Sequence, residues 1–277
     1  MAITSFYVTE PKLRRIEKSI YIDRIVHRWY VDNFMQEHFV KSFSYSSFAC
    51  LKGKGMHNAC LYVQKMMKHC KRIWNNYYII KMDVAKYFQN IDKQILYEIL
   101  CRKIKDKNLL WLSREILYSN GVDKGLPIGN YTSQCFANIY LNELDQYMKH
   151  KLKLKYTCRY MDDVVALVNT KEEAIEKLNL IRSFLKDKLC LELNRKTQIF
   201  KSTQGVNFCG YKINEYRLKI RDKGKRKLKK KVKFLEKQVK QGKMTCIEAH
   251  KYLSGHLGYI NVASTKNLEN KLFATDA

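Results

Sequence analysis

The chain has 277 residues, of which 46% are hydrophobic, as is ordinary for a globular protein with one large core or two smaller ones. It carries 53 Lys and Arg against 26 Asp and Glu, and the formal charge of +27 indicates a polyanionic partner, with nucleic acid first. No run approaches the roughly 18 apolar residues of a membrane-spanning helix, and the N-terminal sequence lacks the apolar core of a signal peptide. We therefore expect a cytoplasmic protein with no membrane partner.

The cysteines and the scarcity of proline also limit the fold. Nine cysteines lie far apart with no CxxC pair, which argues against a zinc site and a disulfide framework and predicts buried, reduced thiols. The chain has only two prolines and no Gly/Ser-rich stretch. We expect its subdomains to pack directly together, without a flexible linker.

The first 76 residues mix basic helical stretches with a glycine-punctuated segment. A helical pattern of apolar residues is predicted within 14–34. Its apolar positions are Ile16, Ile20, Ile25 and Trp29. Gly53 and Gly55 then interrupt the chain before a second predicted helix over 58–70. This basic segment is typical of a subdomain that faces nucleic acid.

The next segment predicts a strand that ends on a carboxylate. The apolar, β-rich run over 77–83 ends at Asp83, and a helical pattern follows to Leu100. After the glycines of 125–129, an amphipathic helix is predicted to about Met148. Asp83 is therefore expected at the end of a strand.

Two adjacent carboxylates lie between two apolar strands. The strands are predicted over 156–160 and 164–168, which leaves Asp162 and Asp163 on a hairpin turn. Adjacent carboxylates repel each other without a cation, and one sheet would bring Asp83 to the same edge. Phosphoryl transfer to a primer hydroxyl uses two magnesium ions, which prefer carboxylate oxygens. The alternative is a plain solvated turn, where Asp is frequent.

The C-terminal part is predicted to be helical and very basic. A charged helix over 171–189 leads into a strand-like stretch over 191–200 and a short hairpin over 208–213. From 217 to 243 there are 14 basic residues and two acids, and four apolar residues recur at intervals of four, three and four. These are Leu228, Val232, Leu235 and Val239. They predict a basic amphipathic helix, followed by another over 247–257; a calmodulin target or a membrane-surface helix would have the same pattern.

Sequence blocks in a particular order carry a resemblance to reverse transcriptases. The segment Tyr160-Met-Asp-Asp163, preceded by Arg159, resembles the YxDD box of that family. The segment Asp83-Val-Ala-Lys-Tyr-Phe88 is similar to the first catalytic block, and the match spans nearly all of residues 11–265. The resemblance implies an α/β right-hand polymerase fold. It places the fingers at 1–76, a palm with an antiparallel sheet and finger-palm insertions at 77–215, and a short helical thumb at 216–277.

The resemblance also implies the roles of individual residues. Two Mg²⁺ ions, or Mn²⁺ as a substitute, would be held by Asp83, Asp162 and the Val84 carbonyl, with Asp163 in support. The finger cations nearest the triphosphate would be Lys12, Arg14 and Arg24, Phe88 would exclude a ribose 2′ hydroxyl, and Lys196 would act on the leaving pyrophosphate. The primer grip would comprise Phe208, Gly210 and Tyr211. Taken alone, Phe88 is an ordinary core residue and each of these cations an ordinary surface charge.

The segment over 125–134 is similar to the family's nucleotide and template pocket, with two departures. Ile128 and Gln134 replace the residues that most relatives carry, while Gly129 is retained. This pattern resembles the reverse transcriptases of diversity-generating retroelements, which copy a template repeat with errors at adenines. Because Ile128 cannot donate the amide hydrogen bond that Gln would offer, we hypothesise low fidelity. The alternative is that Ile128 only packs against the palm.

The resemblance implies an RNA-directed DNA polymerase that binds template RNA, a primer or cDNA duplex and dNTPs. In relatives of the retroelement branch, a small basic accessory protein takes part in mutagenic retrohoming. Roles in antiviral (phage) defence, CRISPR adaptation or as an intron maturase stay open. A catalytically silent RNA-binding scaffold is the alternative from another class, although it has no need of three acids in polymerase order.

Overall fold

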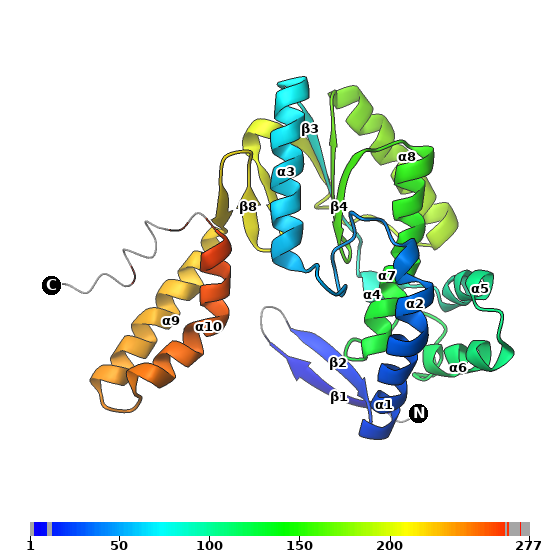
Figure 1. Ribbon diagram of the computed structural model, residues 1–277, viewed down its shortest axis with the longest axis horizontal. Coiled ribbons are helices and arrows are strands. Elements are labelled where there is room, and N and C mark those ends of the chain that lie inside the picture. The colour runs from blue at the N-terminus through cyan, green and yellow to red at the C-terminus, as the bar shows by residue number, and fades with distance from the viewer. Residues whose placement is uncertain (1–2, 10–12, 264, 266–271, 273–277) are drawn as a thin grey trace.

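The structure is a computed structural model that describes residues 3–9, 13–263, 265 and 272. Its elements form a central body with a two-helix arm at one side and an N-terminal β-hairpin that points toward this arm (Figure 1). The body contains two hydrophobic cores, one on each face of a four-stranded sheet. No helix in these described ranges is long and apolar enough to cross a lipid bilayer.

The central sheet is antiparallel with strand order β4-β5-β3-β6. Its strands are β3 (Tyr78–Asp83), β4 (Tyr156–Tyr160), β5 (Asp163–Val168) and β6 (Gln198–Lys201). Alternate residues face opposite sides, so Ile80 and Val164 enter one core while Ile79 and Val165 enter the other. Because both faces are buried, the two central strands β3 and β5 are apolar along most of their length.

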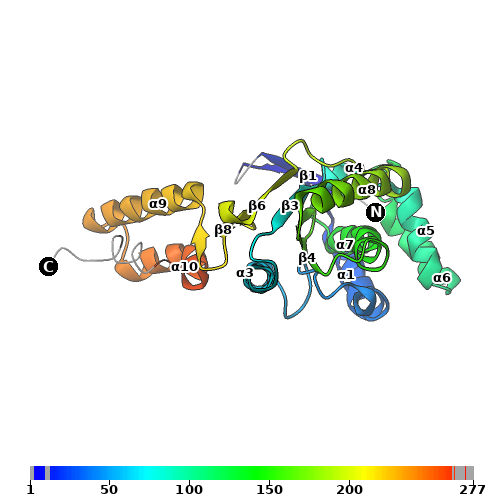
Figure 2. The same cartoon turned by 90° about the horizontal axis from the view of Figure 1, so that it is seen from above.

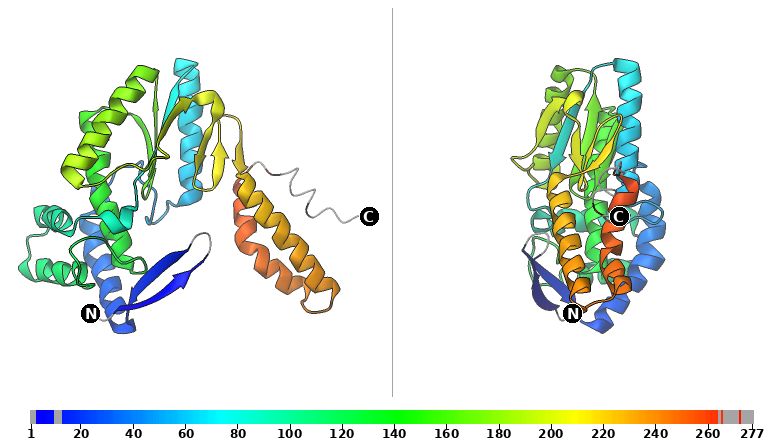
Figure 3. Two further views of the ribbon diagram at one scale, coloured as in Figure 1. Left: turned by 180° about the vertical axis from the view of Figure 1, so that it is seen from behind. Right: turned by 90° about the vertical axis from the view of Figure 1, so that its left-hand side faces the viewer.

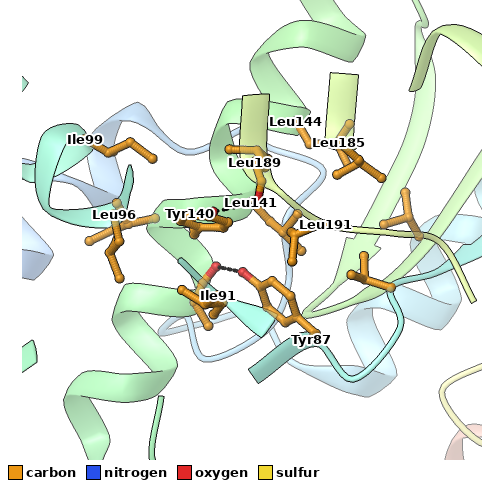
Figure 4. Close-up of a cluster of buried hydrophobic side chains, with 14 of the residues drawn as sticks. Tyr87, Ile91, Leu96, Ile99, Tyr140, Leu141, Leu144, Leu185, Leu189 and Leu191 are labelled. Atoms are coloured by element: carbon orange, nitrogen blue, oxygen red, sulfur yellow. Dashed lines mark hydrogen bonds between the residues drawn. The ribbon is translucent and has the colours of Figure 1, made fainter. Parts of the chain in front are cut away.

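One face of the sheet is covered by α7 (Tyr131–Gln146) and α8 (Lys171–Leu189). A π-helical segment, Tyr147–Lys151, continues α7. The core on this side is shown in Figure 4, where the Tyr140 hydroxyl donates to the Leu189 carbonyl at 2.7 Å and the Tyr87 hydroxyl donates to the Ala137 carbonyl. The other face is covered by α3 (Met56–Trp74).

The N-terminal part begins with a hairpin of β1 (Ile3–Val8) and β2 (Arg14–Ser19). The chain continues through α1 (Tyr21–Tyr30), a π-helix (Val31–Met35), α2 (Gln36–His38) and a 3₁₀ turn (Val40–Ser42). Three more helices lie between β3 and α7, namely α4 (Tyr87–Asn90), α5 (Lys93–Lys103) and α6 (Lys107–Leu117). The side chains of Asp92 and Asp106 cap the N-termini of α5 and α6.

The C-terminal part begins with a 3₁₀ turn (Ser202–Gln204) and a three-stranded sheet, followed by a helical hairpin. The sheet contains β7 (Val206–Phe208), β8 (Tyr211–Ile213) and β9 (Leu218–Ile220). Helices α9 (Asp222–Lys240) and α10 (Cys246–Val262) then lie side by side and extend away from the body (Figures 1 and 2). Thr245 and Glu248 form a capping box at the start of α10.

Most predicted elements exist, but the N-terminal prediction was partly wrong. Residues 14–19 form strand β2 and not the start of a helix, because they pair along their length with β1, whose residues had no predicted element. The predicted apolar helix face is also wrong, since Ile25 and Trp29 are half-exposed whereas His27 and Tyr30 of α1 are buried. Tertiary pairing outweighed the local helical pattern here.

Smaller corrections concern boundaries and thiols. The helix predicted over 58–70 starts two residues earlier and ends four later, and the strand predicted over 191–200 starts only at Gln198. All nine cysteines are free thiols, but Cys50, Cys190 and Cys246 are exposed, so the prediction of uniformly buried thiols was wrong.

Candidate active site

The three predicted acids lie at one edge of the central sheet. Asp83 is the last residue of β3 and Asp163 the first of β5, and the two are register partners. The backbone N–H of Val84, the residue after Asp83, donates to the Asp162 carbonyl at 3.3 Å. Asp162 therefore also lies at the end of β3. Asp163 belongs to the strand, so only Met161 and Asp162 make the turn, and the prediction that both acids lie on it is corrected.

The turn between β4 and β5 has an uncommon backbone conformation. Met161 has a φ of 57°, which a non-glycine residue seldom adopts. Such a conformation costs roughly 1–3 kcal/mol and persists only where the surroundings hold it in place. The Nη1 group of Arg159 donates to the Met161 carbonyl at 3.2 Å and is one such restraint.

Arg159 is the centre of a buried polar network beneath the turn. Its side chain is 1% exposed, and its Nε and Nη2 groups donate to the Asp145 carboxylate at 2.7–3.0 Å. Its Nη1 also donates to Asn138 Oδ1 at 3.1 Å. A buried charge is tolerated only when it is paired and hydrogen-bonded, and Asp145 and Asn138, both on α7, supply these partners. The network therefore ties the acid-bearing turn to a core helix.

The electrostatics of the acids favour a bound cation. Burial raises the pKa of Asp162, the negative charge of Asp83 raises it further, and Lys81 and Arg14 oppose this effect. Lys81 lies two residues before Asp83 on the same strand and forms an ion pair with Asp163. Burial lowers the pKa of Lys81 to about 8. Two neighbouring carboxylates, Asp83 and Asp162, thus lack an equivalent cationic partner within the described chain.

The two carboxylates of Asp83 and Asp162 suit a magnesium ion that takes its other ligands from water and substrate. Among the described residues, no group of three His, Cys, Asp or Glu side chains gathers closely enough to hold a metal alone. Magnesium commonly binds through one or two carboxylates and completes its shell with water and substrate phosphate. Asp83 and Asp162 supply hard oxygen donors of that kind, while Asp163 is engaged by Lys81.

Of the three predicted finger cations, only Arg14 is placed near the acids by the described contacts. Arg14 on β2 lies near enough for its charge to lower the pKa of Asp162. Arg24 is exposed on α1, with its guanidinium 5.6 Å from the ring centroid of Tyr21, so the described contacts do not bring it to the acids. Lys12 lies outside the described residues.

The predicted nucleotide pocket runs from α4 to the start of α7. Phe88 is half-buried, and its carbonyl accepts from Leu126 N–H at 2.7 Å. Ile128 is also half-buried, and its carbonyl accepts from Glu17 N–H of β2 at 2.8 Å. Gly129 has a φ of +147°, and a Cβ there would lie 2.6 Å from the Glu17 carbonyl oxygen, so only glycine fits.

The remaining pocket residue and the predicted leaving-group lysine are exposed. Gln134 on α7 accepts a hydrogen bond from the Cys50 thiol at 3.3 Å. Lys196 follows Asn194 in a tight turn, where its N–H donates to the Asn194 side chain at 3.0 Å. Asn194 N–H donates to the Asp83 carbonyl at 2.7 Å, so this turn is attached directly to the strand that carries the acid.

The predicted primer grip is a two-residue hairpin between β7 and β8. Phe208 and Tyr211 are register partners and both are buried. Cys209 and Gly210 form the turn, with φ values of 45° and 84°. Positive φ at both positions is the requirement of the tightest hairpin turns.

A ring junction attaches this hairpin to the arm of α9 and α10. Tyr211 stacks on Tyr259 of α10 with centroids 5.3 Å apart, and its hydroxyl hydrogen-bonds the Nδ1 of His57 at 2.9 Å. The Tyr259 hydroxyl donates to Met56 Sδ at 3.3 Å. Residues of α3, β8 and α10 thus meet at one point.

Sequence analysis gave no role to Lys81, Arg159, Asp145 or this junction. A signal existed for Lys81 and Arg159, because each is a long charged residue within a predicted strand, and such residues are rarely buried unless paired. No local pattern indicates the junction, because His57, Tyr211 and Tyr259 are far apart in sequence.

A model of the family described as "Reverse transcriptase (RNA-dependent DNA polymerase)" matches residues 12–213. The "Putative COX1/OXI3 intron 2 protein" of Saccharomyces cerevisiae is 25% identical over 237 residues, which cover 62% of this chain and 27% of that protein. Protein YkfC of Escherichia coli is 25% identical, over 73% of this chain and 63% of that protein. The Retron Ec73 reverse transcriptase of Escherichia coli is 27% identical, over 66% of this chain and 61% of that protein. The matches therefore span between about a quarter and just under two thirds of these relatives.

Solved telomerase structures share the fold. The telomerase of Candida tropicalis, in complex with a TWJ fragment of telomeric RNA, superimposes with a TM-score of 0.59 at 13% identity, over 83% of this chain and 48% of that one. The Candida albicans telomerase superimposes with a TM-score of 0.54 at 11% identity, over 79% of this chain and 45% of that one. At these identities the likeness concerns the fold alone, and it confirms the predicted α/β right-hand polymerase architecture with an antiparallel sheet.

Proposed function

The chain belongs to the reverse transcriptase family, and from this premise we propose that it extends a primer on an RNA template with deoxynucleotides. The observation that carries the proposal is the alignment of Asp83 with Asp163 across the sheet, with Asp162 on the adjoining turn. A scaffold that only bound RNA would gain nothing from raising the pKa of a half-buried acid, Asp162, next to a second acid.

Each residue has a proposed task. Two Mg²⁺ ions would be held by Asp83, Asp162 and the Val84 carbonyl, with Asp163, which is paired with Lys81, in a supporting position. The chemistry that the bound ions supply is activation of the primer hydroxyl and neutralisation of the phosphates. Arg14 binds the triphosphate, Phe88 contacts the sugar, and Lys196 neutralises the leaving group. The Phe208–Tyr211 hairpin positions the primer end.

We propose a division into fingers (1–76), palm (77–215) and thumb (216–277). Helix α9 buries Leu228, Val232 and Leu235 against its surroundings and exposes lysines elsewhere. A duplex phosphate backbone attracts such a basic surface through counterion release. Seen from behind in Figure 3, the β1–β2 hairpin and the α9–α10 arm lie on either side of one region below the sheet, which is the proposed course of the template and primer.

The activity is tested by extension of oligo(dT) on poly(rA) with dTTP and Mg²⁺. We expect product from the parent protein and a loss of at least about a thousandfold in Asp162→Ala. Asp187→Ala, which removes an exposed acid of α8, is the matched control and should keep full activity. Equal absence of product from the parent and Asp162→Ala, with accessory protein supplied, would contradict the proposal.

Within the family we propose the branch of diversity-generating retroelements, on the pattern of Ile128 and Gln134. The backbone carbonyl of Ile128 is hydrogen-bonded to β2, and its aliphatic side chain has no group that could hydrogen-bond the incoming nucleotide. Ile128→Gln should lower misincorporation opposite template adenine by about tenfold, whereas Ile175→Gln, at an exposed isoleucine of α8, should leave it unchanged. Equal error rates for the parent and Ile128→Gln would remove the support for this branch.

A further inference from the structure

Asn130, to which the proposed function gives no task, joins the predicted nucleotide pocket to the hairpin of β1 and β2. Its side chain is buried, and its Oδ1 accepts from the backbone N–H of Ser19, the last residue of β2, at 2.9 Å. Its Nδ2 donates to the Ser19 hydroxyl at 3.0 Å. Two hydrogen bonds between the same two residues fix their relative orientation as well as their separation. The end of β2 is therefore held in one direction.

The place of Asn130 in the chain makes this contact unusual. Asn130 is the N-cap of α7, a position where an Asn side chain commonly accepts from the N–H groups of the first helical turn. Here the side chain makes no such bond to α7. Its hydrogen bonds go to β2 instead, 111 residues away in the sequence. The residue thus serves the contact with the hairpin and not the helix that it precedes.

The hairpin is attached to the body at one end. All hydrogen bonds between its described residues and the rest of the chain lie within the last three residues of β2, and they comprise the two from Asn130 and the 2.8 Å bond from Glu17 N–H to the Ile128 carbonyl. On one face, a cavity of about 580 Å³ is lined by Ser5 and Glu17 of the hairpin and by Gln89 and Lys124 of the body. Figure 3 shows the hairpin extending away from this attachment. Contacts at the end of β2 therefore decide where the hairpin points.

Arg14 lies at the other end of β2, five residues from Ser19 and about 17 Å along the strand. Its side chain is exposed, and none of the ion pairs among the described residues includes it, so its position follows that of the strand. A rotation of the hairpin by about 10° at Ser19 would move Arg14 by about 3 Å. A misplacement of about 1 Å in a binding group can cost about a hundredfold in rate. The contact at Ser19 thus controls how Arg14 meets its ligand.

We propose that Asn130 is a positioning residue for the incoming nucleotide, which orients the β1–β2 hairpin through Ser19 so that Arg14 meets the triphosphate. The inference rests on the proposed polymerase function, in which Arg14 binds that group. Asn130 is buried, so it acts through the strand and not by contact with the nucleotide. An interaction made equally in the bound and transition states affects KM alone. Loss of Asn130 should therefore raise the KM for the nucleotide and leave kcat unchanged.

The first test measures the KM for dTTP during extension of oligo(dT) on poly(rA). Asn130→Ala should raise KM about tenfold and keep kcat within about twofold. Ser19→Ala loses only the hydroxyl contact, should raise KM about threefold, and carries the test if Asn130→Ala melts early. Asn142→Ala is the matched control and should leave KM unchanged, because it removes a buried Asn of α7 that is bonded to Gln146. An unchanged KM in both Asn130→Ala and Ser19→Ala would overturn the inference.

A double-mutant cycle with Arg14 separates positioning from general stabilisation. Arg14→Gln should itself raise KM at least about tenfold, and adding Asn130→Ala should then raise it by no more than about twofold. A residue that only stabilised the fold would have the same effect with or without the arginine. Equal effects of Asn130→Ala in the parent and in Arg14→Gln would therefore overturn the inference.

Nucleotide binding without catalysis separates this inference from the proposed function. Titration calorimetry uses the full chain, dTTP, Mg²⁺ and a primer–template whose primer ends in a dideoxynucleotide, so that no bond can form. If the parent extended no primer but its Kd for dTTP rose about tenfold in Asn130→Ala, the proposed function would fail and the inference would stand. An active parent with an equal Kd for dTTP in Asn130→Ala would overturn the inference alone.

Discussion

The acid-bearing turn and the α9–α10 arm use charge in opposite ways. At the turn, the Arg159 side chain is only 1% exposed. Its guanidinium donates five hydrogen bonds to Asp145, Asn138 and Met161. On α9 the lysines are mostly exposed and only the apolar seam is buried. Catalysis at a phosphate requires acids fixed to within a fraction of an ångström, whereas attraction of a polyanion works over about 8 Å without fixed geometry. The same protein therefore has a rigid charge network and a diffuse one.

The largest expected effect comes from removing the buried cation. Arg159→Met should lower the free energy of unfolding by about 3–5 kcal/mol, because it leaves Asp145 buried without a partner. Urea unfolding measures the change. Arg102→Met, which breaks the exposed 2.9 Å ion pair with Glu143, is the control and should cost at most about 1 kcal/mol. Similar losses in both variants would show that burial does not distinguish the two pairs.

A double variant sharpens this comparison. Arg159→Met combined with Asp145→Leu removes both charges and should recover most of the stability. It leaves the Met161 carbonyl without its donor, so the kcat for extension should stay well below that of the parent. Full recovery of kcat would mean that the network stabilises the fold without positioning the turn.

The second effect concerns Lys93, a buried cation for which no carboxylate of the described residues lies at hydrogen-bond distance. Lys93 donates to Asn120 Oδ1 and the Val122 carbonyl, and burial lowers its pKa to about 8. Between pH 8 and 10 the unfolded state binds more protons at this residue than the folded state, so stability should rise with pH by about 2 kcal/mol. In Lys93→Met that rise should disappear from chemical unfolding measured across this range. An identical pH dependence in both proteins would contradict the assignment.

A third, smaller effect is expected where the arm meets the hairpin. Tyr259→Ala removes the ring stacked on Tyr211 and should raise the Kd for primer–template about tenfold, because the arm loses its orientation relative to the hairpin. Fluorescence anisotropy with a labelled duplex measures this. Tyr259→Phe keeps the stack and loses only the contact with Met56, so its Kd should change less than twofold. An equal rise in both variants would assign the effect to the hydroxyl.

The smallest effect on stability is expected from the exposed lysines. A triple variant that replaces Lys229, Lys230 and Lys233 by Gln removes three positive charges. The slope of log K for nucleic-acid binding against log salt concentration should fall by up to about 3. Melting curves should change little, since surface substitutions stay within about 0.5 kcal/mol each. An unchanged salt slope would show that this face of α9 does not contact nucleic acid.

Local sequence patterns predicted much of the central sheet and one helix of the arm. The apolar run ending at Asp83, the strands on either side of Asp162 and the seam of α9 follow from periodicity, because each depends on which residues an element must bury. The order of the blocks predicted the family and the fold. The helix predicted from residue 14 failed because β2 is stabilised by pairing with β1, which no local pattern showed.

The tertiary structure alone decided which charged groups meet. Nothing in the segment around Arg159 names Asp145 on α7 as its partner, and nothing around Asp83 names Asp163 as the residue opposite. Such partners depend on strand register and helix packing between segments remote in sequence, which periodicity does not encode. The sequence by itself thus determined the acids, their strand ends and the expectation that they share one edge, while the register of β3 with β5 set Asp163 opposite Asp83 and the packing of α7 set Asp145 beside Arg159.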